Sequence, residues 1–323
     1  MLKYLREDIQ DFSPYGVVEK NVPIKLDANE GYQRPDGLNR YPNDRANDLQ
    51  MKLAQKLARK PAEILLGNGS SELIDLVLKA YLETGEIVVS ISPTFSMYKQ
   101  YTIIHKGIYR EYPLRNMMRL DADGFLEFIS EIKPKIVILC NPNNPTGTTL
   151  PWKDVMRIIS NVDAMVILDQ AYIEFADNPG FFDPRELKNL IILRTFSKAW
   201  GLAGIRLGYM IANTETINCI HRIRSPYNLN TLTQELGLLA LKEGPEATIE
   251  LVKSERIRMT QALIKLGITP LPSQTNFLFF AAHEYIYNSL MKNGIMIRRF
   301  NRELAGYFRL TIGNPEENNA VLE

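Results

Sequence analysis

Short apolar segments alternate with longer amphipathic ones over residues 60–212. The apolar segments are rich in branched side chains and are bounded by Gly, Pro, Asn or Asp, a pattern typical of strands buried on both faces of a sheet. We predict strands at Ile64–Leu66, Ile87–Ile91, Ile136–Cys140, Met165–Leu168, Ile191–Leu193 and Arg206–Ile211, and crossover helices at Ser71–Leu82 and Trp152–Ile159. This region is therefore predicted to be an α/β unit with a mostly parallel sheet flanked by helices.

The pattern changes after residue 213. A long helical stretch, Glu235–Leu266, is interrupted only at Gly244 and Pro245, and three alternating segments follow it at Phe277–Phe280, Ile295–Arg299 and Phe308–Ile312. A helical run followed by antiparallel strands predicts a smaller α+β domain. We divide the chain into an extended N-terminal arm over 1–45, a large domain over 46–230 and a small C-terminal domain over 231–323.

The composition narrows the class of protein and of ligand. A chain of 323 residues with 45% apolar residues can bury a sizeable core, which argues against disorder. Because 38 Lys and Arg stand against 37 Asp and Glu, no net charge attracts nucleic acid or an anionic membrane, and we expect a small-molecule ligand. Two cysteines are too few for a disulfide framework. With only three histidines, the chain also has few ligands for a metal site. With no apolar segment of membrane-spanning length, we expect a soluble, cytoplasmic protein without a metal.

Polar residues directly follow three of the predicted strands. NPNNPTG follows the strand that ends at Cys140, DQAY follows Leu168, and RTFSKAWGLAGIR follows Leu193. In a parallel sheet, ligands bind beyond the carboxyl ends of the strands. About one βαβ unit separates each of these segments from the next, so we predict that all three face a single cleft.

The motifs NPNNPTG, DQAYIEF and TFSKAWGLAGIRLGY, in this order, resemble those of the fold-type-I aminotransferases that depend on pyridoxal 5'-phosphate (PLP). Over nearly the whole chain the resemblance is to the histidinol-phosphate aminotransferase family. Its further motifs are LDANE at 26–30, RYP at 40–42, PTFSMY at 93–98, PYNLN at 226–230 and FRLTIG at 308–313. The resemblance implies the fold-type-I architecture, with PLP bound in the large domain.

The resemblance also assigns a role to each residue around the cofactor ring. Lys198 would hold PLP covalently and then act as general acid and base. Asp169 would bond the protonated ring nitrogen, and Asn144 and Tyr172 would bond the phenolic oxygen. Phe95 would stack on the ring. A helix cap at Asp169, a turn residue at Asn144 and a core side chain at Phe95 are the structural alternatives.

The cofactor phosphate would lie at the start of a helix. Gly67–Glu72 joins a predicted strand to a predicted helix, so the amides of Ser70 and Ser71 can bind an anion. The segment has neither the GK[ST] ending of a P-loop nor the full GxGxxG spacing. By resemblance, the phosphate site is completed by Thr195, Ser197, Arg206 and, from the neighbouring subunit, Tyr41. The active enzyme would then be a homodimer to which the arm contributes contacts.

The substrate contacts follow from the same resemblance. Arg309 is the candidate for the substrate carboxylate, because a planar guanidinium pairs with both oxygens at once. The remaining candidates for substrate binding are Tyr15, Asn29, Asn228 and Arg298, and Arg299 adds a second cation beside Arg298.

The family resemblance predicts amino transfer from L-histidinol phosphate to 2-oxoglutarate, a step of histidine biosynthesis. Two departures bear on the substrate: the segment between Asn29 and Tyr41 is short, and Gln170 replaces the usual acidic residue. An aromatic amino acid aminotransferase and a threonine-phosphate decarboxylase are the alternatives on the same fold. A non-catalytic PLP-fold ligand sensor is more remote, because such a protein does not need the full set of catalytic residues.

Overall fold

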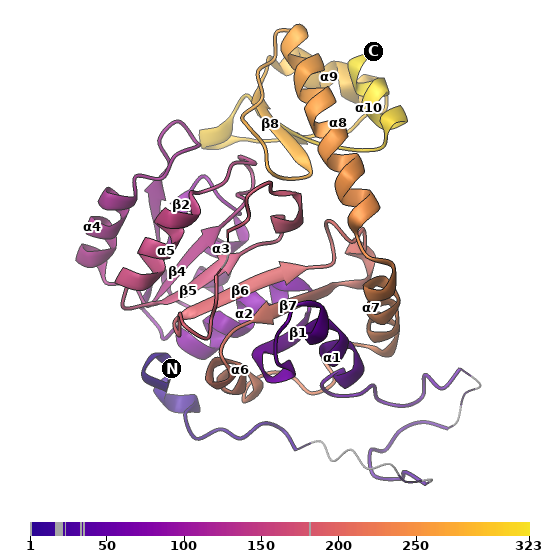
Figure 1. Ribbon diagram of the computed structural model, residues 1–323. Helices are drawn as coiled ribbons and strands as arrows, with labels where there is room; N and C mark the ends of the chain where they lie inside the picture. The colour runs from indigo at the N-terminus through magenta and orange to yellow at the C-terminus, as the bar shows by residue number, and fades with distance from the viewer. Residues whose placement is uncertain (1, 17–21, 23, 33, 35, 181) are drawn as a thin grey trace.

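The computed structural model describes residues 2–16, 22, 24–32, 34, 36–180 and 182–323, and a seven-stranded sheet forms its centre (Figure 1). The strands lie in the order β1-β7-β6-β5-β4-β2-β3. Their bounds are β1 Ile64–Asn68, β2 Ile87–Ser92, β3 Ile108–Pro113, β4 Ile136–Cys140, β5 Met165–Asp169, β6 Leu190–Thr195 and β7 Leu207–Ile211. Strands β2 to β6 are parallel, and β7 runs antiparallel to both β6 and β1.

All six strands predicted for the large domain are present, and β3 is an additional one. Sequence reasoning missed β3 because its residues, IYREYP, lie at the edge of the sheet and are mostly exposed. The prediction of a mostly parallel sheet is confirmed, with β7 as the exception. Arg206 precedes β7 instead of starting it, because its φ of 53° is left-handed and not extended.

Helices cover both faces of this sheet. Consecutive strand residues point to opposite faces, so each apolar strand contributes to two separate cores. Helices α1 (Asn47–Lys56), α4 (Ala122–Ile132), α5 (Trp152–Asn161) and α7 (Thr231–Glu243) contribute to one core, whereas α2 (Gly69–Tyr81), α3 (Met97–Ile104) and α6 (Thr214–His221) contribute to the other. This double coverage explains why the strands are continuously apolar.

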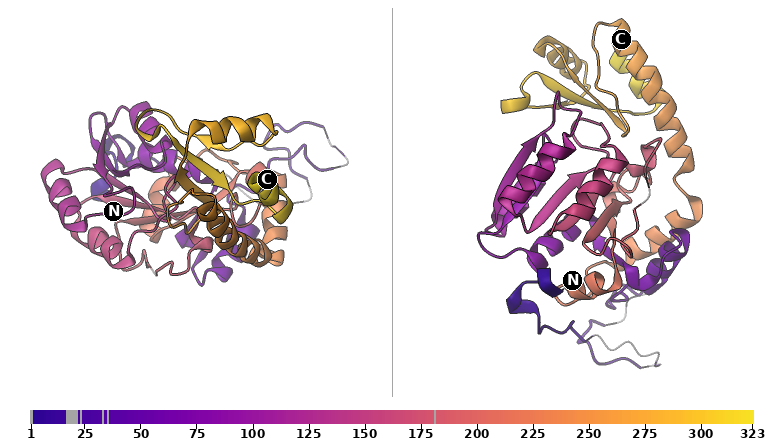
Figure 2. Two further views of the ribbon diagram at one scale, coloured as in Figure 1. Left: turned by 90° about the horizontal axis from the view of Figure 1, so that it is seen from above. Right: turned by 60° about the vertical axis from the view of Figure 1, so that its left-hand side comes forward.

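The C-terminal part forms a second, smaller layer. Its antiparallel sheet has the order β8-β10-β9, with β8 at Phe277–Ala281, β9 at Arg298–Arg299 and β10 at Tyr307–Thr311. Helices α8 (Glu246–Lys265), α9 (Glu284–Lys292) and α10 (Pro315–Leu322) accompany it, and α8 runs from the large sheet toward the small one (Figures 1 and 2). The predicted helical stretch is divided between α7 and α8 at Gly244, whose φ is 78°. The domain boundaries themselves stay a prediction.

The N-terminal arm begins with two short 3-10 turns, Leu2–Tyr4 and Glu7–Ile9. Leu5 and Ile9 are buried against the large domain, so residues 2–9 are more ordered than a fully extended arm. The described residues beyond this point run as an irregular segment away from the sheet (Figure 1). Among the described residues, no helix is long and apolar enough to cross a membrane.

Candidate active site

A cavity of about 710 Å³ lies where the carboxyl ends of β4, β5 and β6 meet the β9–β10 region of the small domain. The predicted convergence of the three polar segments on one cleft is therefore confirmed. The predicted site residues that line the cavity are Ser70, Ser71, Phe95, Asn144, Asp169, Tyr172, Thr195, Ser197, Lys198, Arg206, Arg298 and Arg309. Arg299 lines it as well.

Asp169 is the last residue of β5 and is buried at the floor of the cavity. Its Oδ2 accepts a hydrogen bond from the Tyr98 hydroxyl at 2.7 Å, and its Oδ1 accepts one from the Ala171 amide at 3.0 Å. Burial raises the pKa of the Asp169 carboxyl, whereas these two hydrogen bonds act in the opposite direction. A buried carboxylate of this kind is suited to pairing with a cationic ring nitrogen.

Lys198 follows β6 and extends into the same cavity. Burial lowers the pKa of its ammonium group, and the nearby guanidinium of Arg309 lowers it further. The Lys198 Nζ lies 5.3 Å from the centroid of the Tyr172 ring. A lowered pKa makes the neutral amine, which is the nucleophilic form, more accessible near neutral pH.

Arg309 joins the small domain to the large one. It lies on β10, and its Nη1 donates a hydrogen bond to Oδ1 of Asn144, in the loop after β4. Its guanidinium is 5.1 Å from the centroid of Phe277, which in turn packs edge-on against Tyr172 at 5.3 Å. These contacts hold the Arg309 guanidinium beside the Asn144 side chain and close enough to Tyr172 to interact with it electrostatically.

The anion-binding end of the cavity depends on a close approach between backbone segments. A Cβ on Gly208 would lie 2.5 Å from the Ser70 amide nitrogen, and one on Gly69, whose φ is 76°, would lie 2.6 Å from Arg206 Nη2. Only glycine fits at these two positions. The start of α2, the guanidinium of Arg206 and the hydroxyl of Ser197 thus gather at one point, where Arg206 Nη1 donates to Ser197 Oγ at 3.4 Å.

These residues fit the cofactor that the resemblance implies. The anion donors Ser70, Ser71 and Arg206, the carboxyl of Asp169 and the amine of Lys198 all line this one cavity. Phe95 also lines the cavity and packs edge-on against Tyr98, with ring centroids 5.5 Å apart. The cavity therefore offers donors for a phosphate and a carboxyl for a pyridine nitrogen, which are the groups that PLP carries.

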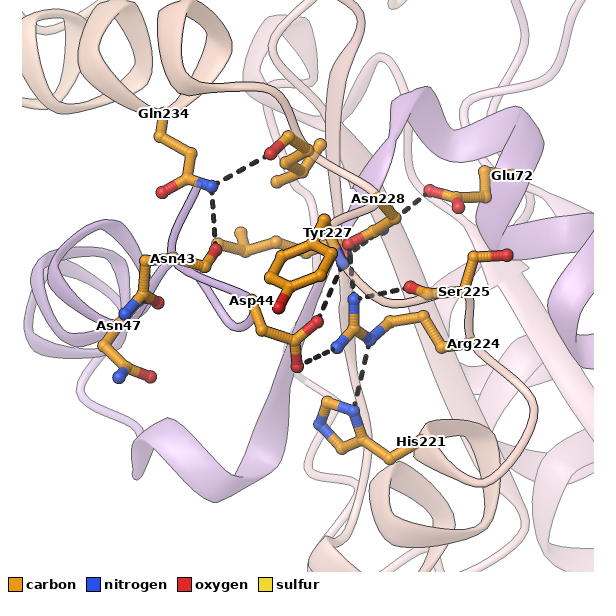
Figure 3. Close-up of polar contacts among 12 residues, drawn as sticks. Asn43, Asp44, Asn47, Glu72, His221, Arg224, Ser225, Tyr227, Asn228 and Gln234 are labelled. Atoms are coloured by element: carbon orange, nitrogen blue, oxygen red, sulfur yellow. Dashed lines mark hydrogen bonds and ion pairs between the residues drawn. The ribbon is translucent and has the colours of Figure 1, made fainter. Parts of the chain in front are cut away.

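Four predicted residues do not line the cavity. Tyr15 and Asn29 are exposed in the arm, and Tyr41 is 57% exposed and stacks on Tyr227 with ring centroids 4.6 Å apart. Asn228 lies outside the cavity, where its Nδ2 donates to Glu72 Oε2 at 2.9 Å (Figure 3). The ligand-binding roles of these four residues stay predictions.

Sequence reasoning named only part of the cavity lining, and Tyr98 and Arg302 are two polar residues that it missed. Tyr98 bonds Asp169 directly and belongs to the PTFSMY motif, so its position in that motif was an available signal. Arg302 lines the cavity after β9, and the signal for it was the run of basic residues that starts at Arg298.

Gln170 lies next to Asp169 but faces a different neighbour. Its Oε1 accepts hydrogen bonds from Nε and Nη2 of Arg194 at 3.0 and 2.9 Å. Glu174 is the acidic group near Arg194, and burial raises the pKa of Glu174 to about 7. Replacement of an acidic residue by Gln170 therefore leaves Arg194 bonded while removing one buried negative charge.

His221 lies in a buried polar cluster outside the cavity, and it makes the stability of the fold dependent on pH. Its Nδ1 faces the Nε of Arg224 at 3.4 Å, and burial, with Arg224 and Arg45 nearby, lowers the pKa of His221 to about 4 against the effect of Asp44 (Figure 3). The unfolded chain binds this proton first, near pH 6.5. We expect the free energy of unfolding to fall by about 2–3 kcal/mol through this residue as the pH drops from 6.5 to 4.

Urea titrations across this pH range test the expectation. His221→Asn is the matched variant, because an amide oxygen can accept the Arg224 hydrogen bond and does not titrate. The wild type should lose stability more steeply with falling pH than the variant. Equal slopes for the two chains would contradict the prediction.

Comparison with known proteins agrees with this geometry. The sequence model of the family "Aminotransferase class I and II" matches residues 19–323. Histidinol-phosphate aminotransferase of Thermoanaerobacter pseudethanolicus is 36% identical over 338 residues, covering 98% of this chain and 96% of that protein. The enzyme of the same name from Pyrococcus furiosus is 37% identical over 333 residues, again covering 98% and 96%.

Solved structures agree as well. The crystal structure of histidinol-phosphate aminotransferase from Sinorhizobium meliloti in complex with PLP matches with a TM-score of 0.81 and 27% identity, covering 88% of this chain and 81% of that chain. The predicted fold class, a fold-type-I architecture with a large mostly parallel sheet and a smaller α+β layer, is confirmed. With a family match over residues 19–323 and relatives aligned along almost its entire length, the chain belongs to the class I and II aminotransferases.

Proposed function

We propose that this chain is a PLP-dependent aminotransferase that converts L-histidinol phosphate and 2-oxoglutarate into imidazole acetol phosphate and L-glutamate. The observation that carries this proposal is the cavity itself, in which the cofactor set around Lys198 and Asp169 faces the cations Arg298 and Arg309. Relatives with 36–37% sequence identity to this chain are named histidinol-phosphate aminotransferase.

When bound, PLP supplies an electron sink for the bond that is broken at the substrate α-carbon. The protein's own groups bind and orient it. Asp169 would pair with the ring nitrogen, Asn144 and Tyr172 with the phenolic oxygen, and the α2 amides and Arg206 with the phosphate. Lys198, whose pKa is lowered by burial, then moves the proton at the substrate carbon through its Nζ.

One cation pair can serve both substrates. Histidinol phosphate carries a phosphate monoester and no carboxylate, whereas 2-oxoglutarate carries two carboxylates. Arg309 and Arg298 are adjacent on paired strands, because β10 and β9 align these two residues directly. Two guanidiniums side by side can bind either type of anion through parallel N–H donors.

Product analysis with purified protein and PLP tests the proposed reaction. Histidinol phosphate added without an acceptor should give one imidazole acetol phosphate per bound cofactor, and added 2-oxoglutarate should then yield glutamate. Threonine phosphate and aromatic amino acids serve as competing donors, with CO2 release measured in parallel. Turnover of an aromatic donor, or release of CO2, without turnover of histidinol phosphate would contradict the proposed substrate.

Arg309→Lys should weaken the binding of both substrates. Lysine keeps the charge but loses the paired donors, and hydrogen bonds to charged groups contribute about 1.5–3 kcal/mol, so we expect KM for histidinol phosphate and for 2-oxoglutarate to rise about 10- to 100-fold. Steady-state kinetics with each substrate varied in turn measures this. Arg258→Lys, on α8 outside the cavity, is the control and should leave both values unchanged. A rise in KM for one substrate alone would argue against shared anion binding.

We also propose a homodimer. Tyr41 stacks on Tyr227 of its own chain and does not line its own cavity, and the arm around it exposes Ile24, Leu26 and Tyr32 to solvent. A second subunit would cover these apolar groups and receive Tyr41 at its cofactor phosphate. Sedimentation equilibrium should give twice the chain mass.

We place the enzyme in the cytoplasm, a proposal supported by Cys140 and Cys219, which are buried free thiols.

A further inference from the structure

Arg224 is a buried guanidinium that links Asp44 to the segment at residues 225–228 (Figure 3). Its Nη2 donates to Asp44 Oδ2 at 2.7 Å, and its Nη1 donates to Asn228 Oδ1 at 2.7 Å and to the Ser225 carbonyl at 2.9 Å. Its side chain is only 6% exposed, and that of Asp44 is 11% exposed. Hydrogen bonds of this type are strong and directional, because both members of the Arg224–Asp44 pair are charged and desolvated.

One branch of this network leads to the N-terminal arm. Asp44 also accepts a hydrogen bond from the backbone amide of Tyr227, at 2.8 Å. Tyr227 has a φ of 55°, which is unfavourable for an aromatic residue and requires support from its surroundings. The Tyr227 ring stacks on Tyr41, with an interplanar angle of 15°. Arg224 therefore fixes the surface on which Tyr41 rests.

The other branch leads to the start of α2. Asn228, held by Arg224, donates to Glu72 Oε2 at 2.9 Å, and the same oxygen accepts the Asn68 amide at 2.5 Å. Asn68 is the residue before the turn that presents the Ser70 and Ser71 amides to the cavity. This branch therefore sets the backbone of the turn that we assign to the cofactor phosphate.

We propose that Arg224 is a positioning residue that couples the turn at Ser70 and Ser71 to the arm at Tyr41, so that an anion bound at the turn orders the arm. The proposal rests on the proposed function, because it takes the turn to be the phosphate site. Arg224 and Asn228 lie outside the cavity, so the effect passes through Asp44 and Glu72 rather than through direct contact with a ligand.

Hydrogen exchange with and without saturating PLP tests the coupling in the full-length protein. The deciding reporter is the Tyr227 amide, which is bonded to Asp44. The Tyr41 amide, which donates to Glu30 Oε1 at 2.7 Å, is followed as well but does not decide, because Tyr41 would also meet the partner subunit's cofactor. In the wild type, PLP should slow exchange in peptides containing the Tyr227 amide about fivefold or more. In Arg224→Gln at saturating PLP, this slowing should disappear, and the PLP dissociation constant should rise about 10-fold.

Two further variants separate coupling from stability. Arg222→Gln removes a neighbouring arginine whose Nη1 bonds the Gln10 carbonyl, so ligand-dependent slowing should persist. Arg224→Lys can keep the pair with Asp44 but cannot also reach Asn228, so it should weaken PLP binding while leaving the exchange of Tyr227 in the free protein close to wild type. This variant also serves if Arg224→Gln does not fold.

The outcomes distinguish this proposal from the proposed function. Failure of the wild type to bind PLP would overturn the proposed function. Normal PLP binding with no slowing at Tyr227, or with the same slowing at Tyr227 in Arg224→Gln, would overturn the coupling. Equal loss of slowing in Arg222→Gln would assign the effect to general destabilisation and would also overturn it.

Discussion

Lys198→Ala should lower kcat for amino transfer by about 10²–10⁴-fold. Lys198 extends into the cavity, where burial and Arg309 lower the pKa of its ammonium group. Alanine can neither bond the cofactor covalently nor move the proton at the substrate carbon. Because Asp169, Asn144 and the anion-binding turn are unchanged, PLP should still bind, but without a covalent link to the protein.

Two measurements separate the loss of chemistry from the loss of binding. Mass spectrometry after borohydride reduction should find the cofactor attached to the Lys198 peptide of the wild type and not to the variant. Equilibrium dialysis should show that the variant still retains PLP. Lys188→Ala, an exposed lysine before β6, is the matched control and should behave as wild type. Retention of a tenth or more of the wild-type kcat by Lys198→Ala would refute the assignment.

The large sheet could be predicted because its strands are buried on both faces. The predicted bounds of β4, Ile136–Cys140, match the structure, and β5 differs by one residue. By contrast, β3 at the sheet edge has only exposed and half-buried positions and was missed, and of the predicted strand Ile295–Arg299 only Arg298–Arg299 is a strand, as β9. The apolar pattern of a sequence indicates which residues are buried. A strand that is held mainly by hydrogen bonds to its neighbour and buries few side chains therefore lacks a clear apolar pattern.

The residues of the cavity lining that could be predicted are those at or just after the carboxyl ends of the strands. Asp169 ends β5 and Lys198 lies in the loop after β6, so their place at one edge of the sheet follows from topology. The position of Asn228 depends instead on long-range contacts with Glu72 and Arg224, which residue patterns do not reveal. The same holds for Arg224, which stands in the sequence as an ordinary basic residue near the end of a helix.

Asp169→Asn should lower kcat about 10²–10³-fold, the range seen when a group that stabilises developing charge is removed. The carboxylate is buried and already held by Tyr98 and the Ala171 amide, so it is oriented before a cofactor arrives. An amide has nearly the same shape and can keep the hydrogen bond from Tyr98. It carries no negative charge, so it cannot hold the ring nitrogen of PLP in its protonated form.

Tyr98→Phe provides a graded comparison at the same position. It removes the hydroxyl that lies 2.7 Å from Asp169 Oδ2 but leaves the carboxylate in place. The loss of one such hydrogen bond is worth about 1–2 kcal/mol, so kcat should fall only about 5- to 30-fold. Asp163→Asn, at an exposed carboxylate paired with Lys3, should leave kcat unchanged.

Single-turnover kinetics with histidinol phosphate, together with the PLP dissociation constant of each variant, measures this series. The expected order of loss is Asp169→Asn, then Tyr98→Phe, then Asp163→Asn. Asp169→Asn removes the carboxylate charge, whereas Tyr98→Phe keeps that charge and removes only the hydroxyl. An equal loss of kcat in the two variants would therefore show that the reaction requires the hydroxyl and not the carboxylate charge. The assignment of Asp169 to the ring nitrogen would then fail.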